Sequence, residues 1–228
     1  MASHRSTTVM KVPVVYSYRK APTRELELSI ESLKNLKEWN GEIIVIGDEP
    51  DLKGDYTHLP VKYTWGKESR VRSNDEICAY LTAADFLDEF IIMADDIYLL
   101  QEWSLEYQNR GTLDEHIKQR KRLDSYTRQL DNTKRYLIKN RKPTLSYELH
   151  IPFLMKADQL RPAAEIAKNN KPVLIRSIIG NMYEIPSKAA QDTKNIPITD
   201  QTVIYSSHDK SFSYEKVKEH LQWYNATE

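Results

Sequence analysis

Apolar and polar residues alternate in blocks over the first hundred positions of the chain. Four short apolar runs predict buried strands, at 12–16, 42–46, 61–64 and 90–93. Leucines and isoleucines with helical spacing predict a helix over 23–39, which Thr23 caps and Asn40–Gly41 ends. The same spacing predicts a second helix over 75–87. Strands that alternate with helices are typical of an α/β fold with a mostly parallel sheet.

The second half of the chain shows a different pattern. Thr112-Leu-Asp-Glu115 has the spacing of a capping box, which predicts a helix from there to about Asn140 with Leu123 on its apolar face. The segments that follow predict an irregular stretch over 147–152, a helix over 157–168, strands over 173–176 and 202–205, a loop over 185–200 and a helix over 214–224.

The composition is that of a globular domain. The 228 residues are 40% hydrophobic and 29% charged, and the six glycines form no phosphate-binding glycine motif. Cys78 is the single cysteine, which excludes an intramolecular disulfide and a multi-cysteine metal site. The N-terminal residues lack the apolar core of a signal peptide, and no stretch approaches the ~20 apolar residues of a membrane span. We therefore expect a soluble, cytoplasmic protein.

The charge is balanced in total but unevenly distributed. There are 33 Lys and Arg against 33 Asp and Glu, which excludes a uniformly basic nucleic-acid coat. Residues 117–142 nevertheless contain ten basic and two acidic residues, a net charge of +8. Such a segment is either the solvated face of a helix or a surface that attracts a polyanion. Tyr126 and Tyr136 within it could stack on bases or sugars.

The strongest chemical signal is the pair Asp95–Asp96, which directly follows the apolar run 90–93. Burying two adjacent carboxylates is unfavourable, and they repel each other unless a cation lies beside them. A hard divalent ion that also binds phosphate oxygens would offset both the cost of burial and the repulsion between the carboxylates. The alternatives are a solvated turn or a helix cap. Because ligands of parallel sheets bind at the carboxyl ends of the strands, we expect the pair to face a cleft shared with Arg19 and Arg72.

On these residues, the chain from about Val12 to Leu100 resembles the GT-A nucleotide-diphospho-sugar transferases. In that family a strand leads into an acidic D-x-D motif that holds Mn²⁺ or Mg²⁺ against the donor diphosphate; here Ala94 precedes the two aspartates. The order of motifs is similar to that of the Stealth-type sugar-phosphate transferases, with counterparts at Val14–Tyr16, Glu25-Leu26, Ser29-Ile30, Ile43–Ile46, Asn74, Phe90–Asp96 and Glu148–Pro152.

The resemblance implies a GT-A-like, Rossmann-related α/β fold with a mostly parallel central sheet flanked by helices and a basic helical insertion. It divides a single domain, 1–228, into a nucleotide-sugar-binding half (1–110), a basic helical segment (111–142) and an acceptor half (143–228). It also implies a nucleotide-diphosphate sugar as donor and a divalent metal, Mn²⁺ or Mg²⁺. The metal ligands would be Asp95, Asp96 and His208.

Seven further residues are site candidates. Those that could contact the donor are Arg19, Arg70, Arg72, Asn74 and Arg176. Arginine suits bidentate contacts to phosphate, whereas Asn74 could instead cap the helix that follows it. Glu148 and His150 share one face of an extended chain and are the catalytic candidates, as base and orienter or as acceptor-binding groups. A hydrogen-bonded, partly buried structural role is the alternative for His150.

The expected function is transfer of a sugar from a nucleotide-diphosphate donor to an acceptor hydroxyl, assisted by a metal. The acceptor could be a polyanion that binds through 117–142, such as phage DNA carrying a hydroxylated base, and the protein would then act in the host cytoplasm. Two alternatives stay open. One is a Stealth-like sugar-1-phosphate transferase. The other is a non-catalytic nucleic-acid-binding protein, which would leave Asp95–Asp96 unexplained.

Overall fold

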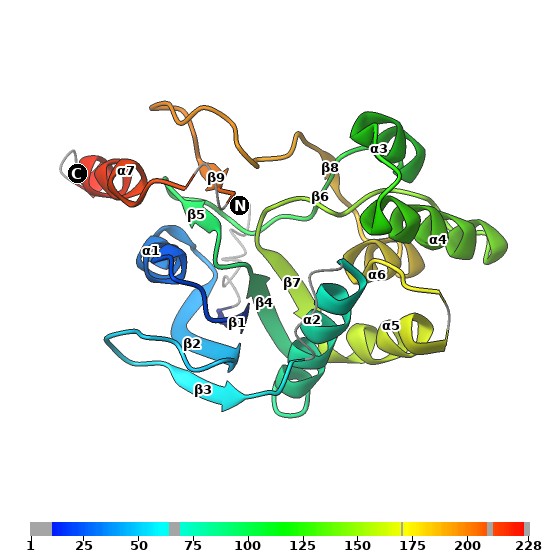
Figure 1. Ribbon diagram of the computed structural model, residues 1–228, viewed down its shortest axis with the longest axis horizontal. Helices are drawn as coiled ribbons and strands as arrows, with labels where there is room; N and C mark the ends of the chain where they lie inside the picture. Colours follow the sequence, from blue (N-terminus) through cyan, green and yellow to red (C-terminus); the bar gives the residue numbers. More distant parts are fainter. Residues whose placement is uncertain (1–10, 64–68, 170, 209–211, 226–228) are drawn as a thin grey trace, which may run out of the picture.

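The computed structural model describes residues 11–63, 69–169, 171–208 and 212–225 and has a five-stranded sheet at its centre (Figure 1). In spatial order the strands are β3 (Thr57–Pro60), β2 (Trp39–Gly47), β1 (Val12–Tyr18), β4 (Glu89–Met93) and β7 (Phe153–Lys156). The first four strands run parallel to one another, and β7 is antiparallel to β4. The predicted α/β fold with a mostly parallel sheet is confirmed.

Both faces of the sheet are buried, because successive side chains of a strand point to opposite sides. In β1, Val14 and Tyr16 face helix α1 (Glu25–Ser32), whereas Val15 faces helix α2 (Ser69–Ala84). The neighbouring strands divide in the same way, with Ile43, Val45, Ile91 and Met93 on the α1 side and Ile44, Ile46, Phe90 and Ile92 on the α2 side. This explains why these strands are continuous apolar runs.

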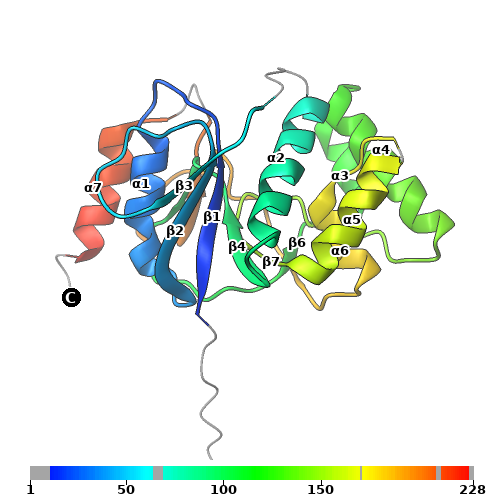
Figure 2. The same cartoon turned by 90° about the horizontal axis from the view of Figure 1, so that it is seen from below.

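The helices form one layer on each side of the sheet (Figure 2). On the α2 side lie α3 (Leu113–Arg120), α4 (Ser125–Lys139), α5 (Ala157–Asn169) and α6 (Ile175–Met182). Helix α7 (Tyr214–Asn225) lies beside α1. Two small sheets join β5 (Ile97–Leu99) to β9 (Ile204–Ser206) and β6 (Gln108–Asn109) to β8 (Lys188–Ala189). Within the described ranges, no helix has both the length and the apolar composition needed to cross a bilayer.

Most predicted strands and helices are present, but the helix predicted over 23–39 is wrong in its bounds. Helix α1 ends at Ser32, a 3₁₀ turn η1 (Leu33–Asn35) follows, and Asn40 and Gly41 belong to β2. The Asn35 side chain donates to the carbonyl of Leu99 at 2.7 Å, and the Asn35 carbonyl accepts from the Trp103 amide at 2.8 Å. These long-range bonds end the helix before its apolar pattern does. Thr23 provides no cap; its hydroxyl donates to Glu25.

The basic segment forms two helices and not the single helix predicted. The capping box at its start is confirmed, since the Thr112 hydroxyl accepts from the amide of Glu115 and the Glu115 carboxylate accepts from the amide of Thr112. The chain then turns at Lys121, whose φ of 52° is left-handed, and Asp124 caps α4 by accepting from the Thr127 amide. Leu123, placed by the pattern on the apolar face, is 90% exposed in this turn.

Two strand predictions are also wrong. The strand expected over 61–64 lies at Thr57–Pro60, and Tyr63 instead packs into the core with its hydroxyl donating to the Ile46 carbonyl at 2.7 Å. The residues 173–176 lead into helix α6, because the Leu174 amide donates to the Thr133 hydroxyl and Val173 packs among the helices. A buried apolar run of this length has no periodicity that separates strand from helix.

Candidate active site

A cavity of about 230 Å³ lies where β1, β4 and α2 meet at the carboxyl edge of the sheet. It is lined by Ser17, Arg19, Asp75, Glu76 and Asp95. Strand β1 ends just before Arg19 and β4 ends just before the Asp95–Asp96 turn, so the two strands deliver these side chains to the same edge. Asp95 and Arg19 therefore share a cavity at the place where parallel sheets bind ligands. The predicted cleft also included Asp96, which does not line this cavity, and Arg72, whose side chain lies outside the described residues.

Arg19 is held in this cavity by the groups around it. Its guanidinium forms an ion pair with the carboxylate of Asp75, a buried residue of α2. The same guanidinium lies 5.4 Å from the centre of the Tyr63 ring. Arg19 thus lines the same cavity as Asp95 with its charge paired to Asp75, and its contact to a phosphate stays a prediction.

Asp95 lies in surroundings that disfavour its charged form. Loss of water around its carboxyl group, together with the charges of Asp96 and Glu25, raises its pKa to about 7, against the opposing charge of Lys194. Glu25 is a buried residue whose carboxylate accepts from the Ser207 hydroxyl at 2.7 Å. The charged form of Asp95 is therefore disfavoured first by burial and then by its acidic neighbours.

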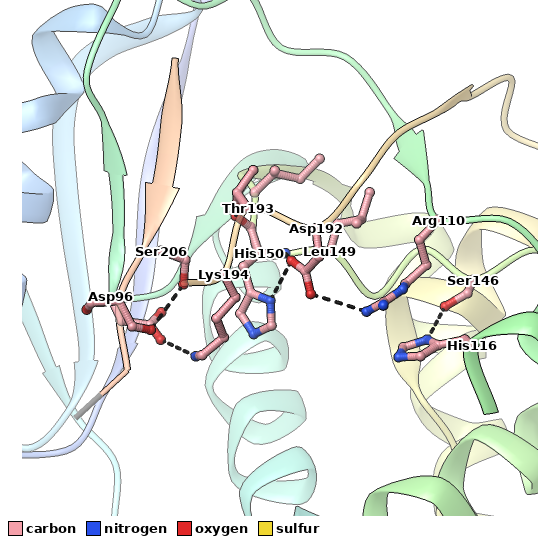
Figure 3. Close-up of polar contacts among 12 residues, drawn as sticks. Asp96, Arg110, His116, Ser146, Leu149, His150, Asp192, Thr193, Lys194 and Ser206 are labelled. Atoms are coloured by element: carbon pink, nitrogen blue, oxygen red, sulfur yellow. Dashed lines mark hydrogen bonds and ion pairs between the residues drawn. The ribbon is translucent and has the colours of Figure 1, made fainter. Parts of the chain in front are cut away.

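Asp96 makes the contact that links this turn to the C-terminal part of the chain. Its carboxylate is 2.7 Å from the ammonium group of Lys194 (Figure 3), and its carbonyl accepts from the amide of Ser207 at 2.9 Å. The latter bond places the exposed residue His208 directly after a residue that contacts the acidic turn. The backbone of the segment before His208 is thus tied to the acidic turn, and the role of His208 as a metal ligand stays a prediction.

The acidic turn fits a hard divalent cation only in part. In the part of the chain that the structure describes, no three His, Cys, Asp or Glu side chains come together as a group that could hold a metal ion. Asp95 and Asp96 still offer adjacent carboxylate oxygens, the ligands that Mg²⁺ prefers, and Mg²⁺ usually takes its other ligands from water and substrate phosphates. Burial is the main cause of the raised pKa of Asp95 and the charges of Asp96 and Glu25 add to it, so a bound cation would favour the ionised form.

A second polar cluster surrounds His150 (Figure 3). Its Nδ1 lies 2.8 Å from Asp192, whose other carboxylate oxygen is 3.2 Å from the Arg110 guanidinium. Burial alone would raise the pKa of Asp192, but the hydrogen bonds from His150 and the charge of Arg110 outweigh it and lower the pKa to about 2. An ionised carboxylate can only accept, so Nδ1 carries the proton and Nε2 is left as an acceptor in the neutral ring. The side chain of His150 is 37% exposed and accessible to a substrate.

Glu148 does not orient His150 as the sequence suggested. Its carboxylate accepts from both the amide and the hydroxyl of Ser177, at 3.1 and 2.8 Å, in the first turn of α6. Burial raises the pKa of Glu148, and the charge of Arg176 opposes that effect. Glu148 therefore fixes the chain before His150 to a helix, and Asp192 takes the orienting position.

The other residues predicted to contact the donor are Arg176, Asn74, Arg70 and Arg72, and they lie in different surroundings. Arg176 donates to the carbonyls of Leu149 and Ile151, at 2.9 and 3.2 Å, and so holds the chain on both sides of His150. Asn74 is exposed within α2, and because that helix begins at Ser69 the alternative role of Asn74 as its cap is wrong. The side chains of Arg70 and Arg72 lie outside the described residues.

Sequence reasoning missed Asp192 and Lys194, which lie in the predicted loop 185–200. Thr193 between them donates to the carbonyl of His150 at 2.6 Å, so three successive residues connect the His150 cluster to the acidic turn. The available signal was the loop prediction itself, because loops on a rigid scaffold often carry functional residues. No periodicity showed which of its polar side chains point inward.

A larger cavity of about 580 Å³ lies on the α1 side of the same edge and was also missed. Its walls come from the segment after β1, the start of α1 and residues 50–53, and they include Tyr18, Lys20, Arg24 and Lys53. Arg24 lies 4.0 Å from the centre of the Tyr214 ring of α7, which holds that wall in place. Its volume is in the range of small-molecule sites.

Comparison with known proteins gives fold similarity only. No protein-family model matches the chain, and no curated protein matches it. The apo form of glycosyltransferase GlyE from Streptococcus pneumoniae TIGR4 aligns with 96% of this chain at 12% identity and a TM-score of 0.47; a second GlyE structure gives 12% and 0.46. This chain spans 64% of the GlyE chain. The 2-C-methyl-D-erythritol 4-phosphate cytidylyltransferase from Thermus thermophilus aligns over 95% of this chain at 9% identity and a TM-score of 0.40, covering all of that protein.

Replacing Asp95 with Asn should stabilise the protein at neutral pH. The folded state holds the Asp95 proton more tightly than the unfolded chain, because its pKa is about 7 against an ordinary 3.8. The wild type therefore loses stability as the pH rises from about 4 to about 7, and the variant does not. The advantage of Asp95→Asn in urea unfolding should grow over this range to about 4 kcal/mol and then stay constant.

The matched control is Asp158→Asn, which removes an exposed carboxylate from α5. Its free energy of unfolding should follow the pH dependence of the wild type. If the difference between Asp95→Asn and wild type were the same at every pH between about 4 and 8, the proposed environment of Asp95 would be wrong.

Proposed function

We propose that this chain is a glycosyltransferase that uses a nucleotide-diphosphate sugar and a divalent metal. The observation that carries the proposal is the acidic turn Asp95–Asp96 at the exit of β4. Asp95 lines a cavity together with Arg19, and the ion pair between Lys194 and Asp96 offsets only part of the negative charge of the turn. A metal-bound diphosphate meets both requirements, since the metal neutralises the carboxylates and Arg19 contacts a phosphate. A purely structural turn would need neither a cavity nor an adjacent arginine.

The donor would occupy the carboxyl edge from the Asp95 cavity toward the cavity beside Arg24. Asp95 and Asp96 would hold the metal, with His208 as a further ligand, and the metal would offset charge on the leaving diphosphate. The N-terminal end of α2, with Arg70, Arg72 and Asn74 in its first turns, favours an anion at this edge. The cavity of about 580 Å³ has room for the nucleoside.

The acceptor would bind on the side of His150. Nε2 of His150 would take the proton of the acceptor hydroxyl while its oxygen attacks the anomeric carbon of the donor sugar. The bond from that carbon to the diphosphate breaks, and the nucleoside diphosphate leaves with the electron pair. Asp192 holds the imidazole and would stabilise its charged form. Glu148 and Arg176 fix the chain that carries it.

An anionic polymer is the acceptor class that best fits residues 117–142. Helix α3 packs against the chain that leads to His150, since the His116 ring bonds to the Ser146 hydroxyl at 2.8 Å. Within the segment, Lys118, Lys121 and Arg122 are exposed. Phage DNA that carries a hydroxylated base is one polymer of this class, and its binding would weaken as salt rises.

The first test is a thermal-stability screen of nucleotide sugars with and without Mn²⁺. One nucleotide sugar should stabilise the wild type only when the metal is present, by about 2.7 kcal/mol at a hundredfold excess over Kd. The Asp95→Asn/Asp96→Asn variant should lose both this effect and turnover, whereas Asp158→Asn should keep both. Sugar transfer releases a nucleoside diphosphate, and transfer of a sugar phosphate releases a nucleoside monophosphate, so the product separates the two reactions.

The proposal fails if no nucleotide sugar stabilises the wild type in a metal-dependent way. It also fails if Asp158→Asn loses the effect as fully as the double variant. Nucleic-acid affinity that is unchanged in the double variant, with no turnover by either protein, would instead establish a binding protein.

His150→Gln should lower the rate of transfer by about 10²- to 10⁴-fold, the usual contribution of a general base. Stabilisation by the donor should be unchanged, because other residues line both donor cavities. Asp192→Asn should give a smaller loss and change the ¹⁵N shifts of the His150 ring, since the charge that holds the Nδ1 proton is gone. Equal loss of donor stabilisation in His150→Gln would show that His150 supports the fold or the donor site.

A further inference from the structure

A separate basic cavity of about 190 Å³ lies between α4 and the segment 171–173 that precedes α6. It is lined by Asn132, Arg135, Tyr136, Lys139, Lys171 and Val173. None of these residues lines the cavity at Asp95 or the one at Arg24. The α4 residues of this basic cavity belong to the segment 117–142, but the acceptor contacts proposed for that segment are Lys118, Lys121 and Arg122, none of which lines this cavity.

The walls of the cavity are fixed relative to each other. The four residues from α4 stand at positions i, i+3, i+4 and i+7, which form one stripe on a helix. The opposite wall is the segment 171–173, which is bonded to α4 at two points. The Asn132 side chain donates to the Pro172 carbonyl at 3.1 Å, and the Leu174 amide donates to the Thr133 hydroxyl at 2.9 Å. Lys171 is therefore held opposite the basic residues of α4.

The cavity carries a net positive charge. Arg135, Lys139 and Lys171 line it, and no acidic residue does. Asp131 lies outside the lining and forms an ion pair with Arg135 at 2.8 Å. Lys139 and Lys171 are exposed. One concave site is thus lined by the positive charges of Lys139 and Lys171. Asp131 offsets part of the charge of Arg135, the third cation.

The two tyrosines of the basic segment differ in a way that matters for a ligand. The Tyr126 ring is covered by the Arg120 guanidinium, 4.6 Å from its centre, and lies edge-on to His116. It is not the stacking surface that the sequence suggested. Tyr136, in contrast, forms part of the cavity wall beside the three cations.

We propose that this cavity binds the phosphate group of a phosphate-bearing ligand. Arg135, Lys139 and Lys171 contact the phosphate, and the Tyr136 ring packs against the sugar or base attached to it. The phosphate belongs either to a phosphodiester of single-stranded nucleic acid or to a small phosphorylated molecule. The proposal does not depend on glycosyl transfer.

The test is binding of a fluorescein-labelled single-stranded oligonucleotide, measured by anisotropy at several salt concentrations, with inorganic phosphate as a competitor. In the variant Lys139→Glu/Lys171→Glu, affinity should fall at least about tenfold, and the slope of log K against log salt should flatten by about 0.7 for each lost contact. The control Lys34→Glu/Lys216→Glu changes the net charge equally at exposed positions outside both the cavity and the segment 117–142. It should stay within about threefold of the wild type.

The competitor distinguishes the two sources of phosphate. Oligonucleotide binding that millimolar inorganic phosphate does not displace indicates a phosphodiester. Displacement by phosphate, or stabilisation of the wild type but not of the cavity variant by a sugar phosphate, indicates a small ligand. The proposal is overturned if neither probe binds, or if the control variant loses as much affinity as the cavity variant while both unfold at the wild-type temperature.

Discussion

The central constraint on this molecule is the placement of two adjacent carboxylates at the end of a strand that is buried on both faces. Asp96 is compensated by Lys194 at 2.7 Å, but Asp95 is left with Asp96 and Glu25 as its main charged neighbours and a pKa of about 7. Such an arrangement costs folding free energy, because the folded state binds a proton that the unfolded chain would release. This unfavourable arrangement at the carboxyl edge of the sheet is the reason to place a ligand there.

The compensation of Asp96 also connects the two polar clusters. Lys194 contacts the acidic turn, Thr193 donates to the backbone of His150, and Asp192 bonds to the His150 ring. Three successive residues of one loop thus set the spacing between the cavity at Asp95 and the imidazole. A shift of this loop would change the charge at Asp96 and the orientation of His150 together.

The sequence predicted the parts of the fold that depend on local pattern. Strands β1, β2 and β4 are apolar on both faces, and the Thr112 capping box is complete within four residues. The first helix ended early because Asn35 bonds to residues more than sixty positions away, which no local pattern encodes. Strand β7 was missed because its four residues alternate in burial and directly precede a helix.

The sequence likewise predicted those residues of the candidate site whose position depends on local pattern. Arg19 and Asp95 follow predicted strands, so the strand-end rule placed them in one cavity. Asp192 and Lys194 come from a loop without periodicity, and Glu148 is bonded to a serine 29 positions away. Their roles depend on how distant segments pack. Within the +8 segment, the ion pairs Arg120–Asp124, Lys134–Asp114, Arg135–Asp131 and Lys142–Glu184 divide the charge into local sites, which a net charge cannot show.

The most direct measurement is anomalous diffraction from crystals grown with Mn²⁺ and a nucleoside diphosphate. The account predicts a manganese peak bonded to carboxylate oxygens of Asp95 and Asp96, with a phosphate bridging the metal and Arg19. A diphosphate bound elsewhere, with no manganese at the acidic turn and the Lys194–Asp96 ion pair intact, would contradict it.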